Sequence, residues 1–382
     1  MIRTYVKAII SLFLLAACGP HLTKGIKQGT ARGHQFAVIG YYSGNSTLVD
    51  SFPVEKLTHI IFSFGHLKGN RLSIGNARDS ATIQKLVSLK DRNPGLKVIL
   101  SLGGWGGCEF CSSVFATDSG RKEFAGSTLH LMKYFKTDGI DLDWEYPSIE
   151  GYPGHAYTTS DKQNFTSLIK TLRDTLGNHY EISFAAGGFD SFLQNAVEWN
   201  KIMPILDKVN LMSYDLVSGY SKMTGHHTPL YPNSSQKQSA DNAVRYLDSI
   251  GMPLNKLIIG AAFYAREWDS VMNNANGLYQ AGRFHHFIPH NQFSRWLSAD
   301  SGFVFYRDTV AKAPYAYSAI KNRYATFDDA ISIKDKTTYA LKKGLGGIMF
   351  WELTLDKQQD GLLDVINETI RISNTEQGTR NR

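Results

Sequence analysis

Eight short runs of apolar and β-branched residues constrain the fold of this chain more than any other feature. The runs cover residues 36–42, 58–64, 97–104, 139–145, 180–188, 208–215, 256–264 and 344–351. Segments with helical periodicity separate most of them, at residues 79–92, 118–136, 161–176, 236–250 and 327–343. Continuous apolar strands that alternate with helices are typical of a parallel sheet covered on both faces. Eight such units predict an α/β fold, a (β/α)8 TIM barrel that spans residues 35–372.

One interval breaks this alternation. Between residues 264 and 326 no clean amphipathic helix is found, and aromatics, Gly, Asn and strand-like pieces such as "GFVFYRD" take its place. Because compact domains seldom carry a long irregular loop, we expect a small α+β insertion after the seventh strand, at about 266–326. The last residues, 373–382, are polar and are expected to form a frayed tail.

The first eighteen residues form a separate targeting segment. Arg3 and Lys7 flank the start of the apolar run "AIISLFLLAA", which is followed by Cys18. This order is typical of a secretory signal, and the run is too short to cross a bilayer comfortably as a mature helix. "LAACG" also resembles the lipobox of bacterial lipoproteins, in which the cysteine is lipidated. We therefore expect an exported protein.

Two destinations are compatible with such a segment. Lipidation at Cys18 would anchor the protein to a bacterial membrane, on the periplasmic side or at the cell surface, and the alternative is a plain secretory signal. Residues 19–34 are Gly-rich, basic and unpatterned, so we expect a flexible tether there.

The remaining cysteines are Cys108 and Cys111, in "CEFC". A zinc ribbon would need a second pair, and a redox motif would need a thioredoxin-like setting in place of the Gly-rich loop found here. An oxidising compartment favours a disulfide, although the sequence leaves open whether the two are bonded. The histidine pairs lack the spacing of metal ligands, so neither a metal nor another cofactor is expected.

The charge pattern gives little support for a macromolecular partner. The net charge is +7, but Lys and Arg are spread over 382 residues with no long basic run. This is typical of a solvated surface, so no nucleic-acid partner is expected. We also expect a monomer.

The fourth apolar run carries the candidate catalytic acids. In "TDGIDLDWEYP", residues 137–147, Asp141, Asp143 and Glu145 occupy alternate positions. Side chains alternate faces along a strand, so these acids share one face, opposite Leu142 and Trp144. Stacked carboxylates repel, so at least one should hold a proton near neutral pH. A raised pKa suits a general acid, and we expect that acid to be Glu145.

The other strand ends carry hydroxyls, a carboxylate and an indole. They supply Tyr41, Ser101, Tyr214, Asp215, Tyr264 and Trp351. This set suits a sugar better than a phosphate, because it lacks a Gly-rich nest and a basic clamp. Asp138 is out of phase with the acid row and is expected to fix the start of the strand by hydrogen bonding.

These residues form motifs that resemble glycoside hydrolase family 18, the chitinase family. "DGIDLDWEYP" matches the family signature DxxDxDxE at every acidic position. "SLGGW" (101–105), "MSYD" (212–215), "GYY" (40–42) and "GLGGIMFWEL" (344–353) resemble other strands of the family. The motifs occur in the family's order over nearly the whole chain after residue 35.

The resemblance implies a retaining hydrolysis without a protein nucleophile, in which the 2-acetamido oxygen of the substrate attacks the anomeric carbon. Glu145 corresponds to the acid/base, Asp143 to the residue that orients the acetamido N–H, and Asp141 to the residue that shares its proton. Tyr214 corresponds to the phenol that binds the acetamido oxygen, beside Asp215.

The same resemblance assigns supporting roles at the edges of the site. Trp351 would be the floor on which the distorted sugar stacks, while Tyr41 and Ser101 would support Asp141. Trp105 would stack on the leaving-group side, and the alternative is packing beneath a loop.

The seventh strand departs from the family pattern. In "GAAFYAREW", Ala262 and Ala265 stand where Pro and Gly are usual, although Tyr264 and Arg266 fall in place as substrate-binding residues.

Three functions are compatible with these motifs. The first is a chitinase that cleaves β-1,4-linked N-acetylglucosamine in chitin or chitooligosaccharides. The second is an endo-β-N-acetylglucosaminidase acting on N-glycans, an activity that usually lacks the insertion. The third is a chitin-binding lectin, in which the acid is replaced; the intact Glu145 argues against it.

Overall fold

The computed structural model describes residues 36–380, with side chains to residue 376. At its centre lie β1 (Ala37–Tyr42), β2 (His59–Lys68), β4 (Lys97–Gly103), β5 (Gly139–Asp143), β6 (Glu181–Gly187), β7 (Lys208–Met212), β8 (Leu257–Ala262) and β14 (Gly347–Trp351). They pair in parallel in the order β1-β14-β8-β7-β6-β5-β4-β2, and β1 also pairs with β2, which closes the barrel. The predicted barrel is confirmed, since one of these strands begins in each apolar run, and only β2 extends beyond its run.

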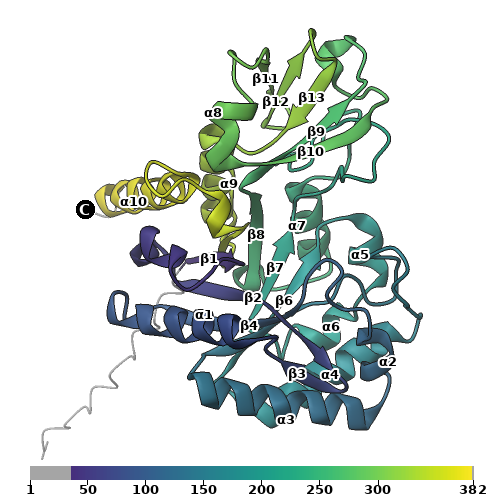
Figure 1. Ribbon diagram of the computed structural model, residues 1–382, viewed down its shortest axis with the longest axis vertical. Helices are drawn as coiled ribbons and strands as arrows, with labels where there is room; N and C mark the ends of the chain where they lie inside the picture. The colour runs from purple at the N-terminus through teal and green to yellow at the C-terminus, as the bar shows by residue number, and fades with distance from the viewer. Residues whose placement is uncertain (1–35, 381–382) are drawn as a thin grey trace, which may run out of the picture. The chain divides into compact units, whose positions relative to one another are not determined.

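Helices follow the barrel strands and cover the outside of the barrel (Figure 1). The longer ones are α1 (Ala77–Ser88), α3 (Asp118–Phe135), α4 (Asp161–Leu176), α7 (Ala240–Ser249), α9 (Ala330–Lys343) and α10 (Leu362–Arg380). The shorter ones are α2 (Cys111–Phe115), α5 (Asp190–Asn195) and α6 (Trp199–Ile202). Their ends follow local signals: Thr117 caps α3 by accepting from the Gly120 N–H, and α9 ends at Gly344 with a φ of 69°.

The end of the chain differs from the sequence-based expectation. Residues 373–382 were expected to be frayed, but α10 continues to Arg380. Polar contacts between successive turns support it: Arg371 pairs with Glu368 at 2.6 Å, and the Thr375 hydroxyl donates to the Arg371 carbonyl at 3.0 Å.

The barrel wall separates two apolar layers. Outward-facing side chains such as Ile140 and Leu142 pack with the helices, whereas inward-facing ones such as Ile99 and Met349 fill the barrel. Polar side chains interrupt the inner layer at one level, because the register places Ser101 opposite Asp141 on one side and Ser183 on the other. The parallel register therefore brings polar groups from separate strands together inside the barrel.

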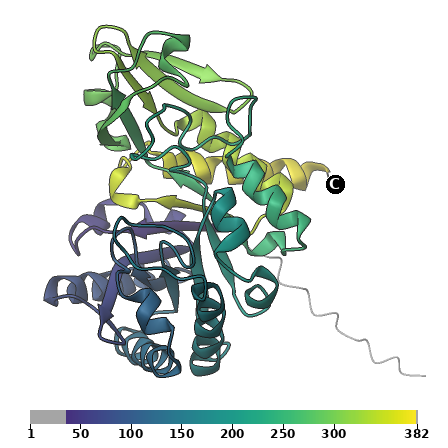
Figure 2. The ribbon, with the colours of Figure 1, turned by 90° about the vertical axis from the view of Figure 1, so that its right-hand side faces the viewer.

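The insertion after β8 is a second sheet. Its antiparallel strands, in spatial order, are β10 (Arg283–Pro289), β9 (Tyr264–Asp269), β13 (Arg323–Thr326), β12 (Ala313–Ser318) and β11 (Val304–Asp308), and α8 (Phe293–Trp296) lies between β10 and β11 in the chain. The predicted insertion after the seventh strand is confirmed. In two perpendicular views the sheet lies beyond one end of β8 (Figures 1 and 2).

A short hairpin was not expected. The end of β2 pairs with the antiparallel strand β3 (Arg71–Ser73). Among residues 36–380, no helix is both long and apolar enough to cross a membrane.

Candidate active site

The acid row lies at the carboxyl end of β5, where barrel enzymes carry their active sites. Leu142 and Trp144 face outward into the helix-packed core. Asp141 and Asp143 belong to the opposite face and are buried, with exposed fractions of 0% and 4%. Glu145 lies just beyond the end of the strand and is half-buried. The alternation predicted from the sequence therefore places the acids on a single inward face.

Asp141 is held by four donors. The hydroxyls of Tyr41 and Ser101 donate to its Oδ2 at 3.1 and 2.9 Å, and the Ser183 hydroxyl and the Asn210 amide donate to its Oδ1 at 2.7 and 3.1 Å. Burial raises the pKa of Asp141 although these four hydrogen bonds oppose the rise. The carboxylate is thus fixed in orientation from both sides.

Asp143 has the opposite environment. Its Oδ1 is buried and has no hydrogen-bond partner among the described residues. Burial, followed by the charges of Glu145 and Asp141, raises the pKa of Asp143 well above its usual value. An unpartnered, buried carboxyl oxygen is energetically costly, so this atom is suited to bind a donor from a ligand or to hold a proton.

Glu145 titrates near neutrality. Burial raises its pKa to about 7, the charge of Asp215 acts in the same direction, and a hydrogen bond from Tyr146 opposes them. At neutral pH the side chain is therefore present both as an acid and as a carboxylate, which is the requirement for a group that donates a proton and later recovers one.

Asp215 follows β7 and stays ionised. Its backbone has a φ of 55°, and its two oxygens accept from the Nε and Nη2 of Arg266, the latter at 2.6 Å. Burial alone would raise the pKa of Asp215, but Arg266, and then His227 with Nδ1 at 3.5 Å, hold it below the usual range. The Arg266 guanidinium also lies over the rings of Tyr264 and Phe284, at 5.6 and 5.5 Å.

Tyr214 supplies a neutral hydroxyl beside the acids. Burial, then the charges of Asp143 and Glu145, raise its pKa well above the usual value. Its hydroxyl donates a weak hydrogen bond to the sulfur of Met349, at 3.8 Å. The phenol is therefore a donor that a stronger acceptor could engage.

Two tryptophans lie at other strand ends. Trp351, at the end of β14, is half-buried and stacks on Phe64 with ring centroids 5.6 Å apart. Trp105, after β4, is 46% exposed and contacts Tyr152 and Tyr220, at 5.6 and 5.9 Å between centroids. Both present aromatic surfaces to solvent near the acid row.

The family follows from comparison with known proteins. The sequence pattern described as glycosyl hydrolases family 18 matches residues 37–356. This chain belongs to glycosyl hydrolases family 18.

Relatives within family 18 agree with this assignment. Chitinase A1 of Niallia circulans is 35% identical over 310 residues, which are 73% of this chain and 43% of that protein. Chitotriosidase-1 of Mus musculus is 35% identical over 317 residues, 78% of this chain and 67% of the relative. A solved structure of a family 18 N-acetylglucosaminidase from Paenibacillus barengoltzii has a TM-score of 0.80 and 34% identity, covering 88% of this chain and all of that one.

Several residues predicted for the family 18 site do not lie on its surface. Tyr41 was expected both to support Asp141 and to bind substrate, and Tyr264 was expected to bind substrate. The two side chains are only 1% and 2% exposed. Tyr41 donates to Asp141, and Tyr264 packs on Phe287 at 4.7 Å. Both hold other groups in place, because a phenol enclosed on every side offers no face to a sugar.

Asp138 lies before the strand, away from the acid row. Its carboxylate accepts from the Lys90 ammonium at 2.9 Å and from the Val98 N–H at 2.7 Å. These contacts connect the start of β5 to its neighbour β4.

Four residues of the site were missed in the sequence: Tyr146, Ser183, Asn210 and His227. Ser183 and Asn210 each interrupt an apolar run with a polar side chain, and that interruption was the available signal. Tyr146 follows the acid directly. No local pattern marks His227, because its partner Asp215 is brought near it only by the loop after β7.

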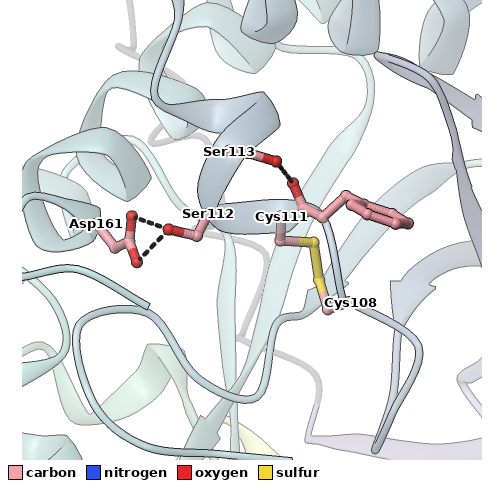
Figure 3. The surroundings of a disulfide bond; sticks show 6 residues. Cys108, Cys111, Ser112, Ser113 and Asp161 are labelled. Atoms are coloured by element: carbon pink, nitrogen blue, oxygen red, sulfur yellow. Dashed lines mark hydrogen bonds between the residues drawn. A yellow bond between two sulfur atoms is a disulfide. The ribbon is translucent and has the colours of Figure 1, made fainter. Parts of the chain in front are cut away.

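Cys108 and Cys111 form a disulfide (Figure 3). Cys18, the predicted lipidation site, lies outside the described residues. Within residues 36–380, no group of three or more His, Cys, Asp or Glu side chains is placed to hold a metal ion.

Proposed function

We propose that this protein hydrolyses β-1,4 linkages between N-acetylglucosamine units of chitin or chitooligosaccharides, with retention and with help from the substrate's own 2-acetamido group. The observation that carries the proposal is the contrast within the acid row. Asp141 is saturated with donors, Asp143 has a free buried oxygen, and Glu145 has a pKa of about 7.

In the first step Glu145 acts as an acid. Its proton moves to the glycosidic oxygen as the acetamido oxygen attacks the anomeric carbon and the leaving sugar departs, which forms an oxazolinium ion. Asp143 accepts the acetamido N–H through its unpartnered oxygen, and Tyr214 donates to the acetamido oxygen. Asp141, beside it in the row, shares the proton that two neighbouring buried carboxylates cannot both lose.

In the second step Glu145 acts as a base. Its carboxylate takes a proton from water, and the resulting oxygen attacks the anomeric carbon and opens the oxazolinium ring. Two displacements at one carbon give retention. Trp351, stacked on Phe64, provides a firm floor for the sugar ring during both steps.

The second candidate is an endo-β-N-acetylglucosaminidase that acts on N-glycans. The sheet inserted after β8 favours chitin, because the second candidate usually lacks such an insertion and because Arg266 of this sheet binds Asp215 in the site. The chain spans less than half of chitinase A1, the first relative named above. Because of this partial coverage, chitin as the substrate of this chain is proposed here and is not carried over from that relative.

Product analysis tests the two candidates together. Defined N-acetylglucosamine oligomers and an N-glycoprotein are incubated with the wild-type protein and with Glu145→Gln, which keeps the shape of the side chain and removes its proton exchange. We expect oligomer cleavage that Glu145→Gln lowers by about 10²-fold or more, with binding retained. Release of N-glycans without oligomer cleavage would support the second candidate, and equal turnover by the two proteins would exclude the mechanism.

We also propose that the protein is exported and lipid-anchored through Cys18. The charged start, the apolar run and the sequence "LAACG" support this. Cys18→Ala should move the protein from the membrane fraction to the soluble exported fraction. Continued membrane association of the variant would contradict the proposal.

A further inference from the structure

Trp105 lies on a turn built largely from glycines. Gly103, Gly104 and Gly106 surround it with φ values of 112°, 80° and 83°. Glycine adopts such conformations readily, and it also has the most freedom to leave them. One backbone hydrogen bond, from Gly104 N to the Asp143 carbonyl at 2.9 Å, ties the start of the turn to the acid strand.

The disulfide holds the other end of the turn. Cys108 and Cys111 are almost fully buried, and their Cα atoms are 5.2 Å apart. Cys111 is the first residue of α2, and its N–H donates to the Cys108 carbonyl at 3.1 Å. The bond therefore connects the turn that carries Trp105 directly to a helix (Figure 3).

That helix is in turn anchored to the segment that carries Tyr152. The Ser112 hydroxyl lies 2.9 Å from each carboxylate oxygen of Asp161, a buried residue at the start of α4 (Figure 3). Asp161 also accepts from the Thr158 N–H at 2.8 Å. Trp105 and Tyr152, whose rings are in contact, are thus fixed on one connected framework.

The disulfide is expected to add little to the global stability of the protein. A disulfide restricts the unfolded chain less as the loop it closes becomes shorter, and this one joins residues only three apart. Its main effect in the folded protein is local: it limits the conformations of the turn between β4 and α2.

We propose that the Cys108–Cys111 disulfide sets the affinity of the leaving-group side for sugar, by holding Trp105 in its stacking position before substrate binds. The inference rests on the proposed function and on the leaving-group role that the family resemblance implies for Trp105. Prior ordering of a stacking side chain improves binding because the ordering entropy is not lost at each encounter. Cys108 and Glu145 line one cavity, but the bond makes no hydrogen bond to the acid, so we expect its effect to be confined to substrates that reach Trp105.

The test compares two substrates that differ in the leaving group. One is an N-acetylglucosamine tetramer, whose leaving sugar reaches Trp105, and the other is chitobiosyl fluoride, whose leaving group is a single atom. The proteins are the wild type, Cys108→Ser/Cys111→Ser, Trp105→Ala and the triple variant. A wild-type sample reduced with a phosphine, with its free thiols counted, removes the bond without a substitution.

For the tetramer, loss of the bond should raise KM by about two- to tenfold and change kcat little, the size of effect that ordering one large side chain produces. Hydrolysis of the fluoride should be unchanged. In the Trp105→Ala background, removing the cysteines should have no further effect on KM, because the ring that the bond positions is gone.

Two results would overturn the inference: equal changes on both substrates, which indicate a general structural role, or no change on the tetramer. An undiminished effect in the Trp105→Ala background would also overturn it. If the oxidised wild-type protein hydrolyses neither substrate, the proposed function itself fails.

Discussion

The charge of a single residue, Asp215, influences how firmly Glu145 holds its proton. Asp215 stays ionised because Arg266 binds both of its oxygens, and its negative charge raises the pKa of Glu145. The acid form of Glu145 dominates below its pKa of about 7. We therefore expect kcat/KM to fall as the pH rises through about 7.

Asp215→Asn should move this fall in kcat/KM, the alkaline limb of the pH profile, to lower pH. The substitution removes a negative charge near Glu145 and leaves Arg266 unneutralised, and both changes lower the pKa of the acid. The measurement is the pH dependence of kcat/KM on an N-acetylglucosamine oligomer. Asp138→Asn is the matched control, because Asp138 lies before the strand and pairs with Lys90. A limb that stays in place, or moves to higher pH, would contradict the assignment.

Ser183→Ala should weaken catalysis through Asp141. The variant removes the 2.7 Å hydrogen bond to Oδ1, so the carboxylate loses a donor that opposes protonation. We expect kcat to drop by about tenfold, a typical effect of losing a hydrogen bond to a charged group, with a smaller change in KM. Ser213→Ala is the control, since that hydroxyl donates to the Gly260 carbonyl. An equal loss in both variants would indicate a packing effect.

At this scale the sequence predicted the acids and two supports of Asp141, Tyr41 and Ser101, but not the other two, Ser183 and Asn210. Strand alternation is local, so the shared face of Asp141 and Asp143 could be inferred from spacing alone. The contact between Asp141 and Ser183 depends on the register between β5 and β6, which no single strand encodes. Tyr264 was predicted as a substrate contact, but it is buried. The sequence of one strand could not show this, because burial depends on what neighbouring strands place above a side chain.

At the scale of elements, a buried ion pair holds α9 against the seventh strand. Lys336 of α9 lies 2.6 Å from Asp328, and both side chains are fully buried. Asp328 also accepts from the Ala262 N–H of β8 at 3.0 Å and from the Thr228 hydroxyl at 3.2 Å. The chain that returns from the insertion is thereby attached to the barrel.

Lys336→Met should lower the free energy of unfolding by about 3–5 kcal/mol, because it leaves Asp328 charged and unpaired in the core. The double variant Lys336→Met/Asp328→Asn should lose less, since neither charge remains. Denaturant unfolding measures both. Arg371→Met, at an exposed pair with Glu368, should change stability by less than about 1 kcal/mol. If Lys336→Met lowers the free energy of unfolding no more than Arg371→Met does, the ion pair between Lys336 and Asp328 does not stabilise the fold as proposed.

Strands and long helices were predictable at this scale because their periodicity is local. The helix α4 occupies the predicted residues, and α9 lies within its predicted segment. The helical part of 373–380 was missed because the sequence there is polar and has no apolar residues at helical spacing.

At the scale of the whole molecule, a charge cluster joins four barrel strands. Glu181 of β6 lies 2.8 Å from both Lys97 and Lys208 and 3.2 Å from His59, residues of β4, β7 and β2. Burial alone would raise the pKa of Glu181, but His59 and the two lysines hold it well below its usual value.

Glu181→Gln should lower Tm at pH 7 by roughly 3–6 °C, as expected for losing hydrogen bonds to charged groups. A lowered folded-state pKa stabilises the protein above the unfolded pKa of about 4.3, and that contribution is lost as the pH falls through the folded value. The difference in Tm between variant and wild type should therefore shrink below about pH 4. A difference that grows on acidification would show that the pKa of Glu181 is not lowered.

The way the insertion joins the barrel also determines how the insertion could be exchanged between related barrels. Its first strand and its last strand are paired, with Thr326 opposite Arg266, so the segment leaves and rejoins the barrel at neighbouring points. A sheet of another size could replace it by recombination at these two points without opening the barrel. Because Arg266 would be exchanged with it, each graft would also reset the working pH of the acid, so the size of the inserted sheet and the pH optimum would be inherited together.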